Sequence, residues 1–127
     1  MSEATTRRER GEQLLNAFGV DAESFVAELN ELAPELGDFL VESALGSILS
    51  RPGLDLRTRE IAVVAALTAV GHAPDQLRTH IGCALNVGVT RSEIVEAIVQ
   101  TCLYAGIPAT LNALVIAKDV FARRGDG

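Results

Sequence analysis

A histidine, a glutamate and a cysteine are the side chains of this sequence best suited to chemistry. His80 borders the apolar stripe of a predicted helix, and Cys83 lies one turn away on the same side. Glu60 is the last charged residue before a long apolar run. A histidine beside an apolar pocket can act as acid or base near neutral pH, and a glutamate can orient its ring. The same pattern also fits a histidine at the edge of the core with a local partner.

Arg51 and Cys83 are the candidate substrate-binding residues. Arg51 precedes a Pro-Gly turn, where its planar guanidinium can hold a carboxylate through two hydrogen bonds or form an ion pair at the surface. Cys83 fits either a nucleophilic thiol or a small apolar side chain of the core. His72, in a Gly-His-Ala-Pro turn, is expected to be exposed, and Cys102 to be a small apolar residue.

Common catalytic and binding motifs are missing from the sequence. It contains no glycine-rich dinucleotide or phosphate loop, no GxSxG elbow and no HExxH helix. The carboxylates are scattered, and none pairs with a histidine at the spacing of metal ligands. We therefore expect no metal site.

The composition indicates one folded, soluble domain. The 127 residues are 48% hydrophobic and 22% charged, which excludes a disordered chain and predicts a single domain over residues 1–127. A net charge of −6 without a basic stripe argues against nucleic acid and anionic membranes as partners. No apolar run reaches the roughly 18 residues of a membrane span, and the start lacks the apolar core of a signal peptide. We expect a cytoplasmic location, which two cysteines also fit.

Hydrophobic periodicity predicts an all-α bundle of about six to seven helices. Gly19 is expected to end the first helix, and Thr90 with Glu93 forms a capping box before a later one. The expected helices span residues 3–18, 22–32, 34–49, 56–70, 75–87, 91–105 and 108–123. The third helix places five apolar residues inward, namely Leu36, Phe39, Leu40, Ala44 and Ile48. The fourth is expected to be buried on most sides, and the apolarity of residues 94–117 predicts a homo-oligomer.

Five short motifs, in this order and spacing, resemble the carboxymuconolactone decarboxylase family. They are Arg51–Asp55 (RPGLD), Arg57–Glu60 (RTRE), Leu77–His80 (LRTH), Asn86–Arg91 (NVGVTR) and Tyr104–Pro108 (YAGIP). Each motif alone is weak, but the ordered set is specific. The likeness runs from about residue 34 to residue 121 and therefore covers most of the chain.

The resemblance implies an all-α, alkylhydroperoxidase D-like subunit that assembles through its C-terminal helices, commonly as a hexamer built from three dimers. It implies loss of CO2 from a small carboxylated lactone, 4-carboxymuconolactone, in the β-ketoadipate pathway of aromatic catabolism. No cofactor is expected, because the lactone supplies its own electron sink. Glu60 and His80 match the glutamate and histidine of the family, which makes them the candidate catalytic residues.

The sequence departs from its relatives at several positions. Alkylhydroperoxidase D-like proteins carry a C-x-x-C pair that would fall near Ala73 and Gln76, so a disulfide-cycling peroxidase is disfavoured. At Leu45 and Cys83 the chain differs from the catabolic decarboxylases, so other lactones are also candidate substrates. Two alternatives stay open: a thiol peroxidase that uses Cys83, and a non-catalytic oligomeric binding protein.

Overall fold

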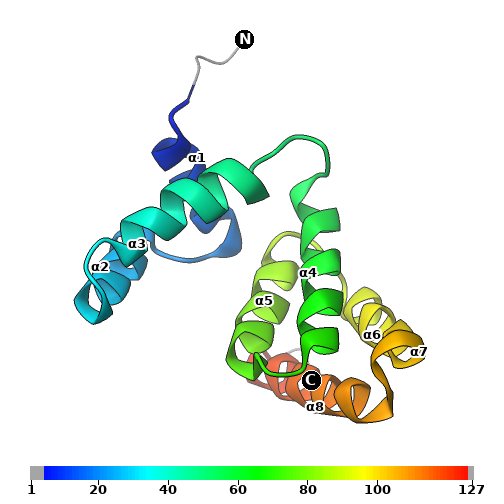
Figure 1. Ribbon diagram of the computed structural model, residues 1–127. Coiled ribbons are helices and arrows are strands. Elements are labelled where there is room, and N and C mark those ends of the chain that lie inside the picture. Colours follow the sequence, from blue (N-terminus) through cyan, green and yellow to red (C-terminus); the bar gives the residue numbers. More distant parts are fainter. Residues whose placement is uncertain (1–4, 126–127) are drawn as a thin grey trace. The chain divides into compact units, whose positions relative to one another are not determined.

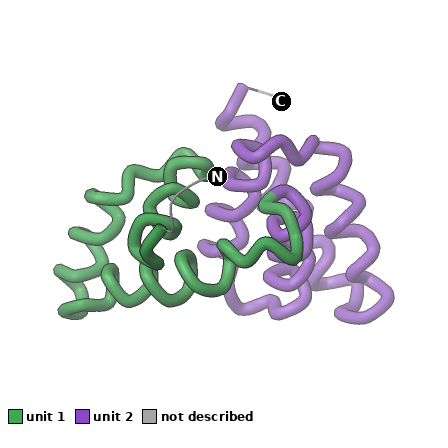
Figure 2. The backbone as a smooth tube through the Cα atoms, turned by 90° about the horizontal axis from the view of Figure 1, so that it is seen from above, with its two compact units in different colours: residues 1–56 green, residues 57–127 purple. Residues whose placement is uncertain are grey.

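The computed structural model describes residues 5–125, and every regular element in that range is a helix (Figure 1). The chain divides into two compact units, residues 1–56 and 57–127 (Figure 2). The first holds α1 (Arg7–Phe18), α2 (Ala22–Leu32), α3 (Leu36–Phe39) and the π-helix η1 (Leu40–Leu49). The helices that follow are α4 (Leu56–Val70), α5 (Pro74–Asn86), α6 (Arg91–Gln100), α7 (Cys102–Ala105) and α8 (Ile107–Arg123). The all-α prediction is confirmed, and none of these helices is long and apolar enough to cross a membrane.

The predicted helix ends are largely confirmed, because capping residues fix them. The Thr90 hydroxyl accepts the Glu93 amide at 3.1 Å, and the Glu93 carboxylate accepts the Thr90 amide at 2.9 Å. Gly19 ends α1 in the left-handed conformation, with φ 79°. The first helix begins at Arg7 rather than at residue 3, because Thr6 caps it in the same way as Thr90 caps α6. Residues 3 and 4 of the predicted helix lie outside the described residues.

The prediction of an α-helix over residues 34–49 is wrong in the number of residues per turn. Residues 40–49 form a π-helix, whose wider turn places Val41, Leu45 and Gly46 inward. The Ser50 hydroxyl donates to the Leu45 carbonyl at 2.6 Å, and these two residues are five positions apart, which is the spacing of π-helical hydrogen bonds. An α-helical stripe therefore misplaces the inward face, and two residues expected inside, Phe39 and Ile48, are largely exposed.

Two glycines bring α1 and η1 into direct backbone contact. A Cβ atom at Gly11 would lie 2.0 Å from the Val41 carbonyl oxygen, and one at Gly46 would lie 2.0 Å from the Arg7 carbonyl oxygen. Any side chain at either position would force the backbones apart. The Arg10 guanidinium adds a hydrogen bond of 3.0 Å to the Gly46 carbonyl. The first unit thus depends on glycine at two facing points.

The second unit is built around one apolar cluster. Its members come from α4, α5, α6 and α8 and from the loop before α6, namely Val64, Leu77, Ile81, Ala84, Val89, Ile94, Ile98, Ala113, Ala117 and Val120. Only Glu60, Val64 and Thr68 of α4 are fully buried, so the prediction of a helix buried on most sides is wrong. The physical reason is that the other faces of α4 carry small residues, such as Ala62 and Ala66, which remain exposed.

The helix expected to run to Gly106 is interrupted at Thr101. The Thr101 hydroxyl donates to the Ile98 carbonyl at 2.6 Å and lies 3.2 Å from the Thr110 hydroxyl of α8. These contacts turn the chain into the short α7 before α8 begins. Gly106, with φ 94°, makes the corner between α7 and α8.

An apolar surface remains exposed over α7 and α8. Ile107, Leu111 and Val115 recur every four residues along α8 and are 58%, 55% and 68% exposed. Leu103 and Tyr104 of α7 extend this surface. Contiguous exposed apolar residues of this kind are typical of a subunit interface.

We predict that the protein is a homo-oligomer, with a hexamer as the expected state, held through the α7–α8 surface. Light scattering at micromolar concentration should give a mass several times the 13.4 kDa of one chain. The double variant Leu111→Glu/Val115→Glu should shift the protein to smaller species, because it places charge in a dry interface. Leu32→Glu, at a position 82% exposed in the first unit, is the matched control. A wild-type monomer would contradict the prediction.

Candidate active site

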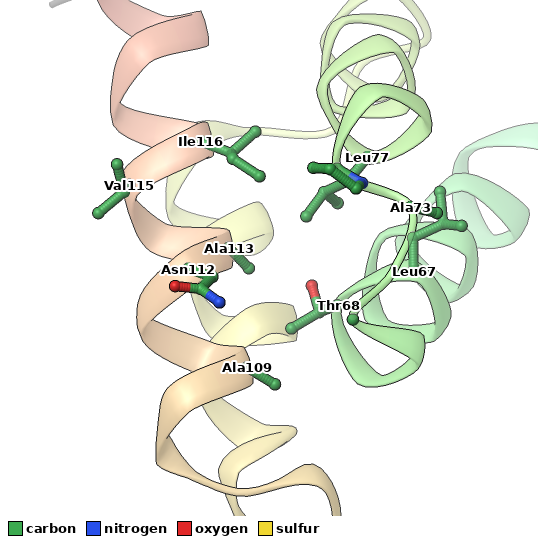
Figure 3. A pocket seen from close by; sticks show the side chains of 11 residues that line it. Leu67, Thr68, Ala73, Leu77, Ala109, Asn112, Ala113, Val115 and Ile116 are labelled. Carbon is green, nitrogen blue, oxygen red and sulfur yellow. The ribbon is translucent and has the colours of Figure 1, made fainter.

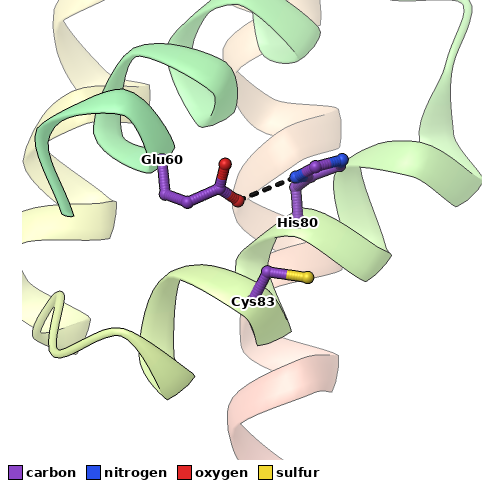
Figure 4. A group of neighbouring side chains, drawn as sticks. All are labelled: Glu60, His80 and Cys83. Atoms are coloured by element: carbon purple, nitrogen blue, oxygen red, sulfur yellow. Dashed lines mark hydrogen bonds and ion pairs between the residues drawn. The ribbon is translucent and has the colours of Figure 1, made fainter. Parts of the chain in front are cut away.

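Glu60, His80 and Cys83 converge in the second unit (Figure 4). Glu60 reaches from α4 toward two side chains of α5, and its Oε1 lies 2.7 Å from His80 Nδ1. The ligand-type atoms of the three residues lie within 4.8 Å of one another. The predicted catalytic pair is therefore brought together across two helices, and one predicted substrate-binding residue lies beside it.

The local sequence explains how these side chains meet. Leu77, Ile81 and Ala84 face the core of the second unit, which orients α5 so that His80 and Cys83 lie at the edge of that core. On α4, Val64 is buried one turn after Glu60 and belongs to the same apolar cluster. Apolar packing thus orients both α4 and α5. In this orientation Glu60, His80 and Cys83 lie close to one another.

The beginning of α4 is fixed by charged contacts. Arg57, one turn before Glu60, forms an ion pair with Glu93 and donates to the Gly88 carbonyl at 3.3 Å. The Thr90 amide, followed by the Arg57 guanidinium, lowers the pKa of Glu93 to about 2. This anchor joins the first turn of α4, one turn before Glu60, to the start of α6.

Glu60 is the most constrained charged group of the site. Its side chain is 0% exposed, and Oε2 has no hydrogen-bond partner among the described residues. The His80 side chain is 24% exposed and connects the buried carboxylate to solvent. The hydrogen bond between Glu60 Oε1 and His80 Nδ1 fixes the orientation of the imidazole ring, and the other ring nitrogen, Nε2, points away from Glu60 (Figure 4).

The Cys83 thiol is held in its neutral form. Burial, and secondly the nearby Glu60 carboxylate, raise the pKa of Cys83 to about 12. A reactive cysteine needs the opposite environment, with positive charge and partial exposure. The Cys83 side chain is also buried, which favours the expectation of a small apolar side chain over that of a nucleophile.

The remaining candidates lie elsewhere in the described chain. Arg51 belongs to the first unit, where it is exposed and lines a pocket of about 400 Å³ together with Arg10 and Asp55. Its carboxylate-binding role stays a prediction. His72 is exposed, as predicted, and Cys102 is partly buried.

A pocket of about 340 Å³ lies between α4, α5 and α8 (Figure 3). It is mainly apolar, and its wall includes Leu77, one turn before His80. Two polar side chains, Thr68 of α4 and Asn112 of α8, point toward the same space. Sequence reasoning missed both residues, although each is a polar residue within an otherwise apolar helical stretch. The size suits a small organic ligand.

We predict that Cys83 reacts slowly with thiol reagents. With a pKa of about 12, roughly one thiol in ten thousand is ionised at pH 8. The measurement is the rate of iodoacetamide labelling at pH 8 in the Cys102→Ser variant, which leaves Cys83 as the single thiol. Adding Glu60→Gln should speed the labelling, because it removes the negative charge that opposes the thiolate. Labelling as fast as that of a free thiol would contradict this account.

Comparison with known proteins gives the family. Residues 34–119 match the sequence profile described as "Carboxymuconolactone decarboxylase family". A 4-carboxymuconolactone decarboxylase of Acinetobacter baylyi is 39% identical over 97 residues, covering 76% of this chain and 72% of that protein. An uncharacterised 15.0 kDa protein of Paracoccus denitrificans is 34% identical, with 91% and 88% covered. A nitrosuccinic acid decarboxylase of Metarhizium robertsii is 32% identical, with 64% and 56% covered. The matched region contains Glu60, His80 and Cys83, and the chain belongs to the carboxymuconolactone decarboxylase family.

Proposed function

We propose that the protein is a cofactor-independent decarboxylase that releases CO2 from a small carboxylated lactone such as 4-carboxymuconolactone. The observation that carries the proposal is the hydrogen bond of 2.7 Å between Glu60 Oε1 and His80 Nδ1, in a chain of this family. Two relatives named as decarboxylases, one for 4-carboxymuconolactone and one for nitrosuccinic acid, support a carboxy-lyase. Aromatic catabolism is the setting that the first of these names suggests.

The reaction needs little from the protein. The carboxylate leaves from the γ carbon of an unsaturated lactone, and its bonding electrons move through the double bond to the lactone carbonyl. The resulting dienolate takes a proton on carbon, which completes the reaction. A hydrogen-bond donor at the dienolate oxygen and one acid suffice. An apolar surrounding favours the step, because the localised charge of the carboxylate spreads as CO2 leaves.

His80 supplies the acid in this proposal. The Glu60 carboxylate accepts the hydrogen of Nδ1 and stabilises the imidazolium, so that Nε2 carries the proton given to the substrate carbon. The exposure of the His80 side chain, 24%, allows a substrate to reach it and solvent to restore the proton. Glu60 thus acts through His80, by orienting the ring and balancing its charge.

Arg51 and Cys83 have binding roles in this proposal. The guanidinium of Arg51 forms a bidentate contact with a substrate carboxylate. Cys83 contributes a neutral, weakly polar surface beside the Glu60–His80 pair, in keeping with its raised pKa. The same raised pKa disfavours the alternative of a thiol peroxidase, since few thiolates would be present to attack a peroxide. A non-catalytic binding protein is the outcome if no substrate is turned over.

His80 variants test the proposed mechanism. Loss of a general acid costs about 100- to 10,000-fold in rate, so we expect His80→Gln to lose activity on that scale while folding normally. Glu60→Gln should lose less and shift the pH optimum, because it removes the charge that stabilises the imidazolium. The measurement is the absorbance change of 4-carboxymuconolactone, with hydrogen peroxide as the control substrate. His72→Gln alters the other histidine and should keep full activity. Full activity in His80→Gln would contradict the mechanism.

The effects of Arg51 variants on KM and on kcat test whether Arg51 binds the substrate. Arg51→Lys keeps the charge but loses the planar fork, so we expect KM to rise more than about tenfold, roughly 1.4 kcal/mol, with kcat little changed. Arg7→Lys, an exposed position of α1, is the matched control. If Arg51→Lys and Arg51→Ala both leave KM at the wild-type value, Arg51 has no part in binding.

A further inference from the structure

The pocket between α4, α5 and α8 lies apart from the Glu60–His80 pair (Figure 3). On α4, Glu60, Val64 and Thr68 follow one another at intervals of one turn on the buried face. Thr68 lines the pocket and lies eight residues after Glu60, which is about 12 Å along the helix axis at 1.5 Å per residue. Neither Glu60 nor His80 lines the pocket. A molecule bound there would occupy a second place in this unit, which the proposed decarboxylation does not use.

Small residues on facing segments leave this space open. Gly71 and Ala73 lie in the turn between α4 and α5, and Ala109 and Ala113 lie one turn apart on α8. Gly71 has a φ of 78°, so a larger side chain there would be strained. The volume of about 340 Å³ equals that of roughly ten water molecules, at about 30 Å³ each. The space therefore suits a molecule of about ten non-hydrogen atoms.

The side chains of the pocket wall determine which kind of molecule fits. None of the described residues that line the pocket carries a charge, and most are aliphatic, including Leu67, Leu77 and Ile116. A carboxylate would lose its hydration in this pocket and gain no cation in return. The pocket therefore favours an uncharged, mainly apolar ligand over the carboxylated substrate of the proposed reaction.

Two polar side chains offer hydrogen bonds within this apolar wall. Thr68 is 2% exposed, and its hydroxyl donates to the Val64 carbonyl at 2.8 Å, so the hydroxyl oxygen can only accept a hydrogen bond from a ligand. Asn112 is exposed on α8, and its carboxamide points toward the same space. The carboxamide offers N–H donors and a carbonyl acceptor. A ligand that has one hydroxyl donor and one carbonyl acceptor can use both residues.

We propose that this pocket binds a small uncharged molecule that joins an apolar body to a hydroxyl group and a carbonyl group, such as a phenolic ketone. The hydroxyl group donates to Thr68, and an N–H of Asn112 donates to the ligand carbonyl. The aliphatic wall covers the apolar body, which releases water from apolar surface on both sides. The inference does not rest on the proposed decarboxylase activity, because binding is measured without any carboxylated lactone.

Calorimetric titration of the full chain with 4-hydroxyacetophenone, at about pH 6, tests the proposal. This phenolic ketone has about ten non-hydrogen atoms and is uncharged at that pH. We expect saturable binding at one site per chain, with a Kd below about 1 mM. 4-Hydroxybenzoate is the matched probe, because an ionised carboxylate replaces the acetyl group on the same ring. It should compete with the ketone for the pocket with an affinity at least about tenfold lower.

Four variants locate the binding site. Ala109→Leu places a larger side chain on the pocket wall and should weaken binding of the ketone more than about tenfold. Ala62→Leu makes the same change at an exposed position of α4 outside the pocket and should bind as the wild type does. Thr68→Val removes the hydroxyl oxygen and Asn112→Leu removes the carboxamide. Each should weaken binding about three- to tenfold, because one hydrogen bond is lost.

Failure of the wild-type chain to bind the ketone saturably at millimolar concentration overturns the proposal. Unchanged affinity in a folded Ala109→Leu, as judged by circular dichroism, or equal affinity of the two probes in competition does the same. If Ala109→Leu fails to fold, unchanged affinity in both Thr68→Val and Asn112→Leu has the same force. A chain that binds the ketone but turns over no lactone keeps the pocket and removes the decarboxylase. Turnover of the lactone without binding of the ketone does the reverse.

Discussion

A carboxylate removed from water is the constraint on which the second unit depends. Glu60 is 0% exposed and is held by a hydrogen bond of 2.7 Å to His80. Burying an ionised carboxyl group costs several kcal/mol unless it is paired, so His80 is as much a structural requirement as a chemical one. A group that must stay paired to remain buried keeps its partner in one orientation. A fixed ring orientation is also what the proposed proton transfer to a substrate requires.

The rest of the unit keeps this pair in place. Apolar packing orients α5 through Leu77, Ile81 and Ala84, and Arg57 ties the start of α4 to the start of α6. Burial, and secondly the Glu60 carboxylate, raise the pKa of the neighbouring Cys83 to about 12, so its thiol adds no charge to the site. Glu60 and Cys83 are buried, whereas the His80 side chain is 24% exposed and faces solvent.

The sequence predicted those parts of the structure that depend on local rules. The capping box of Thr90 and Glu93 and the left-handed Gly19 follow from local hydrogen bonds, and both are confirmed. The pairing of Glu60 with His80 was expected through the family resemblance, since no spacing rule links residues on two helices. The π-helix at residues 40–49 was not predictable, because its five-residue hydrogen bonding leaves no distinct mark in composition. The exposure of most of α4 was not predicted, because the apolar content of a helix does not show which of its faces are covered by other helices.

The glycine contacts between α1 and η1 restrict where the first unit can gain or lose residues. Gly11 meets the Val41 carbonyl, and Gly46 meets the Arg7 carbonyl, at two separate points along the same pair of helices. Sliding one helix by a residue would bring a Cβ atom against a carbonyl at both points, so the pair has one permitted register. An insertion or deletion inside either helix breaks that register, whereas one in the connecting segments does not. Length variation among relatives of this unit should therefore collect in its loops.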